Sequence, residues 1–139
     1  MMALKKVLLA YDGSENSRKA LEWLLNFAPQ TTILTVIVKV LEFPGYIESG
    51  LDEVVKLMRE NQEEQMEKLT EVFTQKGLAA KTIVLDGDPA ARLIEYATKE
   101  RVDLVICGTR GMGGFESLLL GSVAHKLVTH SPVPVLVIK

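Results

Sequence analysis

The stretch that decides the fold is Val102–Lys139, which reads VDLVICGTRGMGGFESLLLGSVAHKLVTHSPVPVLVIK. It contains an apolar strand, a glycine-rich segment, a helix that opens at Gly121-Ser122, and a second apolar strand. Glycines directly after a strand let the backbone approach a ligand closely, and the start of the next helix presents unpaired N–H groups that favour an anion. The stretch therefore predicts a phosphate-binding loop at the end of a buried strand.

The spacing of the glycines makes this prediction more specific. Gly108, Gly111, Gly121 and Ser122 follow the pattern G-x2-G-x9-G-S. Glycines alone would indicate only tight turns, whereas this spacing lies between a buried strand and a helix. The chain contains no G-x-x-x-x-G-K-[ST] sequence, and no G-x-G-x-x-G follows the first strand, so neither a Walker loop nor a Rossmann dinucleotide fingerprint is present.

Composition restricts the class of protein. The 139 residues suit a single domain spanning 1–139, and 47% hydrophobic with 24% charged residues is typical of a soluble globular protein. With a net charge of −2, we expect no attraction to nucleic acid or to an anionic membrane surface. No apolar run is long enough for a membrane helix, and the apolar core near the N-terminus is too short for a signal peptide. We therefore expect a cytoplasmic protein.

Strands and helices alternate along the whole chain. Apolar runs without polar alternation predict strands buried on both faces, and apolar stripes at helical spacing separate them. The expected strands are Leu4–Ala10, Thr31–Val40, Ala79–Leu85, Val102–Cys107 and Val133–Ile138. The expected helices are Ser14–Ala28, Leu51–Lys76, Ala90–Lys99 and, at its outer bounds, Ser117–His130, with a loop over Leu41–Gly50. This order predicts an α/β fold with an open five-stranded parallel sheet, strand order 3-2-1-4-5, and helices on both faces.

Particular residues in the sequence also indicate where helices begin and end. Ser14 is the expected N-cap of the first helix, although Ser17 competes for that position. Gly77 suits the left-handed position after the second helix. Asp88 is the expected N-cap of the third helix, with Pro89 at its first helical position.

The predicted sheet order places a ligand site. Ligands of such sheets bind beyond the carboxyl ends of the strands, where the strand order reverses. The turn after the first strand, with Asp12, would then lie beside Gly108–Gly114. Backbone N–H groups in this region would hold phosphate oxygens, with the Ser122 hydroxyl as a further donor; these groups belong to Gly111, Gly121, Ser122 and Val123.

Three other residues complete the predicted site. Asp12 would accept a hydrogen bond from a ribose hydroxyl, or hold Mg²⁺ directly or through water. Arg110 either pairs with a phosphate or is solvated. Val36, in the second strand, would line an adenine pocket.

These motifs resemble those of the universal stress protein family, and in particular its ATP-binding branch. The resemblance covers essentially the whole chain, through VLLAYDGS at 7–14, TILTVIV at 32–38 and the segment from Gly108 to Lys139. It implies bound ATP, or ADP or AMP, with Mg²⁺, because family members without the glycine pattern do not bind ATP. Carried over by position, the implied nucleotide contacts are Ala10, Asp12, Val36, Cys107, Gly108, Arg110, Gly111, Gly121, Ser122 and Val123.

The resemblance also implies a homodimer whose last strands pair across a two-fold axis. A physical reason supports this, since Val133–Ile138 would form an apolar edge strand that invites aggregation unless it is covered. Pairing with a second copy removes that edge.

Binding is favoured over catalysis. No nucleophile–base pair or paired-carboxylate site stands out, Cys107 is interpreted as a small core residue, and His125 and His130 are too poorly aligned on one helix face to form a metal pair. The leading hypothesis is a stress-response or regulatory module whose nucleotide occupancy modulates its dimer or its partners. The alternatives are a slow ATPase or nucleotidyl-transfer enzyme, and an interaction protein that works without nucleotide.

Overall fold

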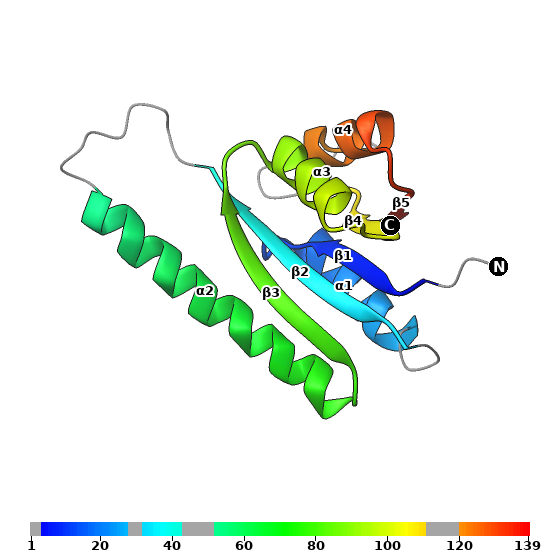
Figure 1. The fold of residues 1–139 in the computed structure, drawn as a ribbon, viewed down its shortest axis with the longest axis horizontal. Helices are drawn as coiled ribbons and strands as arrows, with labels where there is room; N and C mark the ends of the chain where they lie inside the picture. Colours follow the sequence, from blue (N-terminus) through cyan, green and yellow to red (C-terminus); the bar gives the residue numbers. More distant parts are fainter. Residues whose placement is uncertain (1–3, 28–31, 43–51, 111–119) are drawn as a thin grey trace.

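The computed structural model of the chain describes residues 4–27, 32–42, 52–110 and 120–139. The strands are β1 (Lys6–Ala10), β2 (Leu34–Leu41), β3 (Ala79–Asp86), β4 (Leu104–Gly108) and β5 (Val135–Ile138). The helices are α1 (Glu15–Phe27), α2 (Asp52–Gln75), α3 (Pro89–Lys99) and α4 (Ser122–His130). All strands are parallel in the order β3-β2-β1-β4-β5, which confirms the predicted sheet (Figure 1).

Two hydrophobic cores lie on opposite faces of this sheet. The first core packs α1 and α2 against one face, and the second core packs α3 and α4 against the other. Because successive side chains of a strand point to opposite faces, β1 contributes Val7 and Leu9 to the first core and Leu8 to the second. All three side chains are fully buried, as expected for a parallel sheet covered on both sides.

The predicted caps are confirmed at the start of two helices. Ser14 precedes α1, and its Oγ atom accepts a hydrogen bond of 3.2 Å from the Ser17 N–H group. Asp88 precedes α3, and its Oδ2 atom accepts a hydrogen bond of 3.0 Å from the Ala91 N–H group, with Pro89 in the first turn. Each side chain satisfies one of the N–H groups that a helix start leaves without a partner.

Helix α2 ends in a Schellman motif but packs lightly along its length. Gly77 has φ +73°, its N–H group donates to the Thr74 carbonyl at 2.9 Å, and the Leu78 N–H group donates to the Phe73 carbonyl at 2.9 Å. Of the 24 residues in α2, only Met66 and Phe73 are buried. Across the described ranges, no helix combines the length and the apolar character needed to cross a membrane.

Most elements differ from the sequence prediction by one or two residues at an end, and three differences have a cause in the structure. Helix α4 begins at Ser122, which confirms the expected opening at Gly121-Ser122 and not the outer bound Ser117; residues 117–119 lie outside the described part, and Gly121 has an extended backbone with φ −71° and ψ 170°. Strand β2 continues to Leu41, because its pairing with β3 continues that far. Strand β5 starts only at Val135, because Ser131 first forms a turn in which its Oγ accepts from the Val133 N–H group at 3.1 Å.

Asp103 fastens the start of β1 to the segment before β4. Its Oδ2 atom accepts hydrogen bonds of 2.9 Å from the N–H groups of both Lys5 and Lys6. These two bonds, first that of Lys6 and then that of Lys5, lower the pKa of the Asp103 carboxyl group, because they favour its charged form. The resulting stabilisation is fully present above about pH 4, the ordinary aspartate range, and is lost as the pH falls through the lowered pKa of the folded state.

We therefore expect Asp103→Ala to lower the free energy of unfolding at neutral pH, and to differ less from the wild type in acid. Urea unfolding at neutral pH and near pH 3 measures both differences. Glu71→Ala, which removes an exposed carboxylate from α2, is the control and should show no such trend. A destabilisation by Asp103→Ala that is the same at both pH values would contradict this role of the carboxylate.

Candidate functional site

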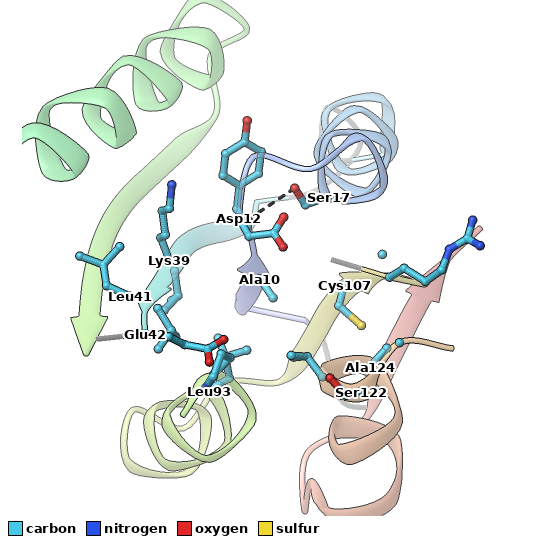
Figure 2. Close-up of a pocket in the computed structure, with 18 of the residues that line it drawn as sticks. Ala10, Asp12, Ser17, Lys39, Leu41, Glu42, Leu93, Cys107, Ser122 and Ala124 are labelled. Atoms are coloured by element: carbon cyan, nitrogen blue, oxygen red, sulfur yellow. Dashed lines mark hydrogen bonds between the residues drawn. The ribbon is translucent and has the colours of Figure 1, made fainter. Parts of the chain in front are cut away.

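A cavity of about 600 Å³ lies at the carboxyl edge of the sheet. The turn after β1, the end of β2, the end of β4 and the start of α4 form its walls (Figure 2). It brings together most of the residues predicted to contact a ligand, namely Ala10, Asp12, Cys107, Gly108, Arg110, Gly121, Ser122 and Val123. Segments about a hundred residues apart in the sequence meet here because β1 and β4 are neighbours in the sheet.

Two predicted residues are not part of this cavity as the structure describes it. Val36 is fully buried in the second core and does not line the cavity. Val38, two residues further along the same face of β2, lines it instead, because Val38 pairs with Ala10 at the end of β1, whereas Val36 pairs with Leu8 further back in the sheet. Gly111 lies outside the described residues.

Asp12 occupies the turn between β1 and α1. Its Oδ1 atom accepts a hydrogen bond of 2.9 Å from the Ser14 N–H group, which is an Asx turn. Its own N–H group donates to the Ser17 Oγ atom at 3.4 Å, and Gly13 between them has φ +85°. These bonds fix the partly buried Asp12 at the cavity wall, near Ser17 and Ala10 (Figure 2).

Gly108 has a packing role at the end of β4. A Cβ atom at this position would lie 2.6 Å from the Asn16 carbonyl oxygen and 2.7 Å from its carbonyl carbon. The missing side chain therefore lets the end of β4 lie directly against the first turn of α1. Contact with a ligand is not needed to explain this glycine.

Gly121 joins α4 to the end of β4. Its N–H group donates a hydrogen bond of 2.7 Å to the Thr109 carbonyl, and a Cβ atom would lie 3.1 Å from the Arg110 Cα atom. Because this N–H group already donates to Thr109, it is not an open donor for a phosphate oxygen in this structure, and the expected contact of Gly121 with a nucleotide stays a prediction. The glycine instead permits the close approach that aims α4 at the cavity.

The first turn of α4 opens into the cavity. Its N-cap residue, Gly121, supplies no side-chain acceptor, and the first N–H group with a partner within the helix is that of His125, which donates to the Gly121 carbonyl at 2.9 Å. Within the described part of the chain, no acceptor is found for the N–H groups of Ser122, Val123 and Ala124, all of which line the cavity. Such a helix start attracts an anion through its N–H groups and its dipole.

Cys107 forms part of the apolar wall. Its side chain belongs to the second core and is 4% exposed. Burial raises the pKa of its thiol to about 11, because the thiolate would be poorly solvated there. The thiol is therefore protonated at neutral pH, which agrees with its interpretation as a small core residue.

The structure adds cavity residues that sequence reasoning missed. They include Tyr11 and Ser17 on either side of the turn after β1, residues at or just after the end of β2, and one residue each from α2 and α3, namely Lys39, Leu41, Glu42, Gln62 and Leu93. Lys39 had a signal in the sequence, since it is the charged residue of the strand LTVIVKVL, whose other residues are apolar apart from Thr35. Gln62 had none, because its place depends on how α2 packs beside β3.

The charged groups at the cavity suit a bound ligand better than a structural metal centre. In residues 4–27, 32–42, 52–110 and 120–139, no group of three or more His, Cys, Asp or Glu side chains could hold a metal ion. Mg²⁺, by contrast, is commonly held by one or two carboxylates together with the phosphates of a substrate. Asp12 is suited to that second arrangement.

Comparison with known proteins identifies sequence relatives over almost the whole chain. A sequence model of the universal stress protein family matches residues 3–139. Universal stress protein MJ0531 of Methanocaldococcus jannaschii is 33% identical over 97% of this chain and 82% of its own length.

Solved structures share the fold. The structure of MJ0577, a universal stress protein of Methanocaldococcus jannaschii, superimposes with a TM-score of 0.88 at 28% identity, covering 98% of this chain and 96% of that one. A universal stress protein family structure from Arabidopsis thaliana with AMP bound gives a TM-score of 0.69 over 97% of this chain and 91% of that one; at 20% identity this likeness concerns the fold alone.

We expect Gly108→Ala to destabilise the protein by about 1–3 kcal/mol, because the new methyl group meets the backbone of Asn16, which cannot move aside cheaply. Urea unfolding of both proteins measures the change. Gly121→Ala is the matched comparison and should cost less, since its closest contact is 3.1 Å and not 2.6 Å. Equal stability of Gly108→Ala and the wild type would show that this packing contact does not constrain β4.

Proposed function

The chain belongs to the universal stress protein family, and we propose that it binds an adenine nucleotide in the cavity at the carboxyl edge of its sheet. In this proposal the protein is a cytoplasmic regulatory module, and nucleotide occupancy changes its dimer or its choice of partner. The observation that carries the proposal is the open first turn of α4, which faces a cavity of about 600 Å³.

The phosphates would lie at the start of α4. The N–H groups of Ser122, Val123 and Ala124 can donate to phosphate oxygens, and the exposed Ser122 hydroxyl adds a donor. Arg110 brings a positive charge to the same part of the wall. ATP, ADP and AMP all present a phosphate that such a turn can hold, so the proposal covers the three nucleotides.

The adenosine would lie across the ends of β1 and β2. Ala10, Val38 and Leu93 offer an apolar surface for the adenine ring, and the size of the cavity falls within the range of small-molecule sites. Asp12 would accept from a ribose hydroxyl or hold Mg²⁺ beside the phosphates. The AMP bound by the Arabidopsis thaliana protein is a precedent for this ligand class on the same fold.

Binding rather than turnover is the proposed activity. Phosphoryl transfer requires an attacking group held in line, a base or positioning residue, and stabilisation of the developing charge. The α4 turn and Arg110 could supply the last of these. We assign no residue as the base, and slow hydrolysis stays the alternative that a turnover assay would detect.

We also propose that two copies pair through β5. This strand is at one edge of the sheet and contacts β4 alone among the described strands. Its residues Val135–Ile138 are all apolar and only partly buried in the single chain. A second β5 across a two-fold axis would cover them and satisfy the outer backbone groups.

Calorimetric titration with ATP and Mg²⁺ tests the nucleotide site, after any co-purified nucleotide has been removed. We expect micromolar binding by the wild type and a loss of at least about tenfold in affinity for Gly121→Val, because the larger side chain pushes α4 away from Arg110. No binding by the wild type would overturn the proposed function.

The control for this experiment is Gly77→Asn. Gly77 lies at the far end of α2 and has φ +73°, a conformation that asparagine tolerates. The affinity of the Gly77→Asn variant for ATP should equal that of the wild type. Both variants should show a cooperative unfolding transition, so that a lost affinity can be assigned to the site and not to unfolding.

Sedimentation equilibrium at micromolar concentration tests the dimer. The wild type should have twice the mass of the 15.4 kDa chain, and Val137→Asp should shift it toward the monomer, because a carboxylate would be buried in the new interface. Val72→Asp, on an exposed position of α2, should leave the mass unchanged. A wild-type monomer at this concentration would contradict the proposed pairing.

A further inference from the structure

The cavity continues across the edge of the sheet to the side that α2 covers. Its apolar lining residues come from both cores: Tyr11 and Leu41 pack on the first core, whereas Val38 and Leu93 belong to the second. The phosphate-binding turn of α4 lies on the side of the second core. The part of the cavity on the first-core side is formed by Tyr11, Lys39, Leu41 and Gln62, and we call it the α2-side lobe.

Lys39 is a charged residue in a strand that is almost entirely apolar. It follows Ile37 on the same face of β2, in a strand whose other residues are apolar apart from Thr35. Its side chain is only partly exposed. A charged group in such a position is costly unless an opposite charge or several hydrogen bonds compensate it.

The described residues compensate the charge of Lys39 only in part. The Lys39 Nζ atom donates to the Gln62 Oε1 atom at 2.5 Å, and Gln62 is uncharged. No carboxylate of the described residues lies within 4.0 Å of the Lys39 ammonium group. The ammonium group has three donors, of which this bond uses one.

Arg59, three residues before Gln62 on α2, shows the contrast. Its guanidinium group pairs with Asp86, lies 3.9 Å from a carboxylate oxygen of Glu63, and donates to the Val84 carbonyl at 2.9 Å. Two neighbouring cations thus face the angle between α2 and the sheet. Arg59 is neutralised by carboxylates of the protein. Lys39 lines the cavity, and its hydrogen-bond partner Gln62 is uncharged.

The carboxylates of the cavity do not replace the missing partner. Asp12 is held in its turn by the Ser14 N–H group. The Glu42 side chain points away from the Lys39 ammonium group (Figure 2). The Gln62 oxygen already accepts from Lys39, so its amide nitrogen adds further donors. The α2-side lobe therefore offers several hydrogen-bond donors and carries the positive charge of Lys39.

We propose that Lys39 and Gln62 form a second anion-binding subsite, separate from the α4 turn. The inference rests on the proposed nucleotide site and specifies its ligand: a nucleotide that carries a second phosphate away from its 5′-phosphate, as a nucleoside 3′,5′-bisphosphate does. The 5′-phosphate binds at the start of α4, and the second phosphate accepts hydrogen bonds from the Lys39 ammonium and the Gln62 amide. Charge-assisted bonds of this kind are the strong ones, so they set the preference.

The test compares AMP with adenosine 3′,5′-bisphosphate by calorimetric titration. We expect the wild type to bind the bisphosphate about tenfold or more tightly than AMP, as one or two hydrogen bonds to a charged group would give. Lys39→Met keeps the length of the side chain and removes its charge, so it should bind both ligands with the affinity that the wild type has for AMP. Lys39→Arg keeps the cation and should retain the preference.

Lys81→Met is the matched control. Lys81 is an exposed lysine on the neighbouring strand β3 and does not line the cavity, so this variant should behave as the wild type does. Equal affinities of the wild type for the two ligands would overturn the second subsite while leaving the proposed function intact. A preference that persists in Lys39→Met would overturn it as well. If the wild type binds neither ligand, the proposed function fails, and this inference fails with it.

Discussion

The hydrogen bond from the Gly121 N–H group to the Thr109 carbonyl, 2.7 Å long, holds the start of α4 at the end of β4. The rest of the site depends on this contact, because it directs the first turn of the helix into the cavity. The absence of a side chain at Gly121 favours this contact, since a Cβ atom would lie 3.1 Å from the Arg110 Cα atom. Gly108 makes a similar contact on the other side of β4, against Asn16 of α1. Both described glycines of the motif therefore act first on packing, and they serve a ligand through the groups that this packing positions.

The two faces of the sheet give the cavity two different chemical surfaces. On the side of α3 and α4 it is apolar, with Val38 and Leu93, and it ends at the helix start of α4. On the side of α2 it is polar, with Lys39 bonded to Gln62. Few buried residues hold α2 against the sheet, namely Met66 and Phe73, so the polar contacts of Arg59 and Gln62 also fix its position. The same contacts that attach this helix thus shape one wall of the candidate site.

Much of the fold was predictable from local patterns. Apolar runs and helical stripes identified each element, and short-range caps such as Ser14 and Asp88 have the hydrogen bonds that their side chains favour. The errors concern places where a distant segment decides the outcome. Helix α4 starts at Ser122 because Gly121 bonds to Thr109, twelve residues earlier in the chain. Val38 and not Val36 lines the cavity, because the register of β2 against β1 places Val38 beside Ala10.

The sequence by itself determined the order and type of the elements, the parallel sheet and the segments that meet at its carboxyl edge. These follow from periodicity, from glycine and proline at fixed positions, and from the few ways in which alternating strands and helices can pack. Only the tertiary structure decided which N–H groups at the start of α4 lack an acceptor among the described residues, and that Lys39 meets Gln62 across 23 positions of the chain. The physical reason is that these contacts join residues from different elements. Their geometry is therefore fixed by helix–sheet packing, which no local pattern records.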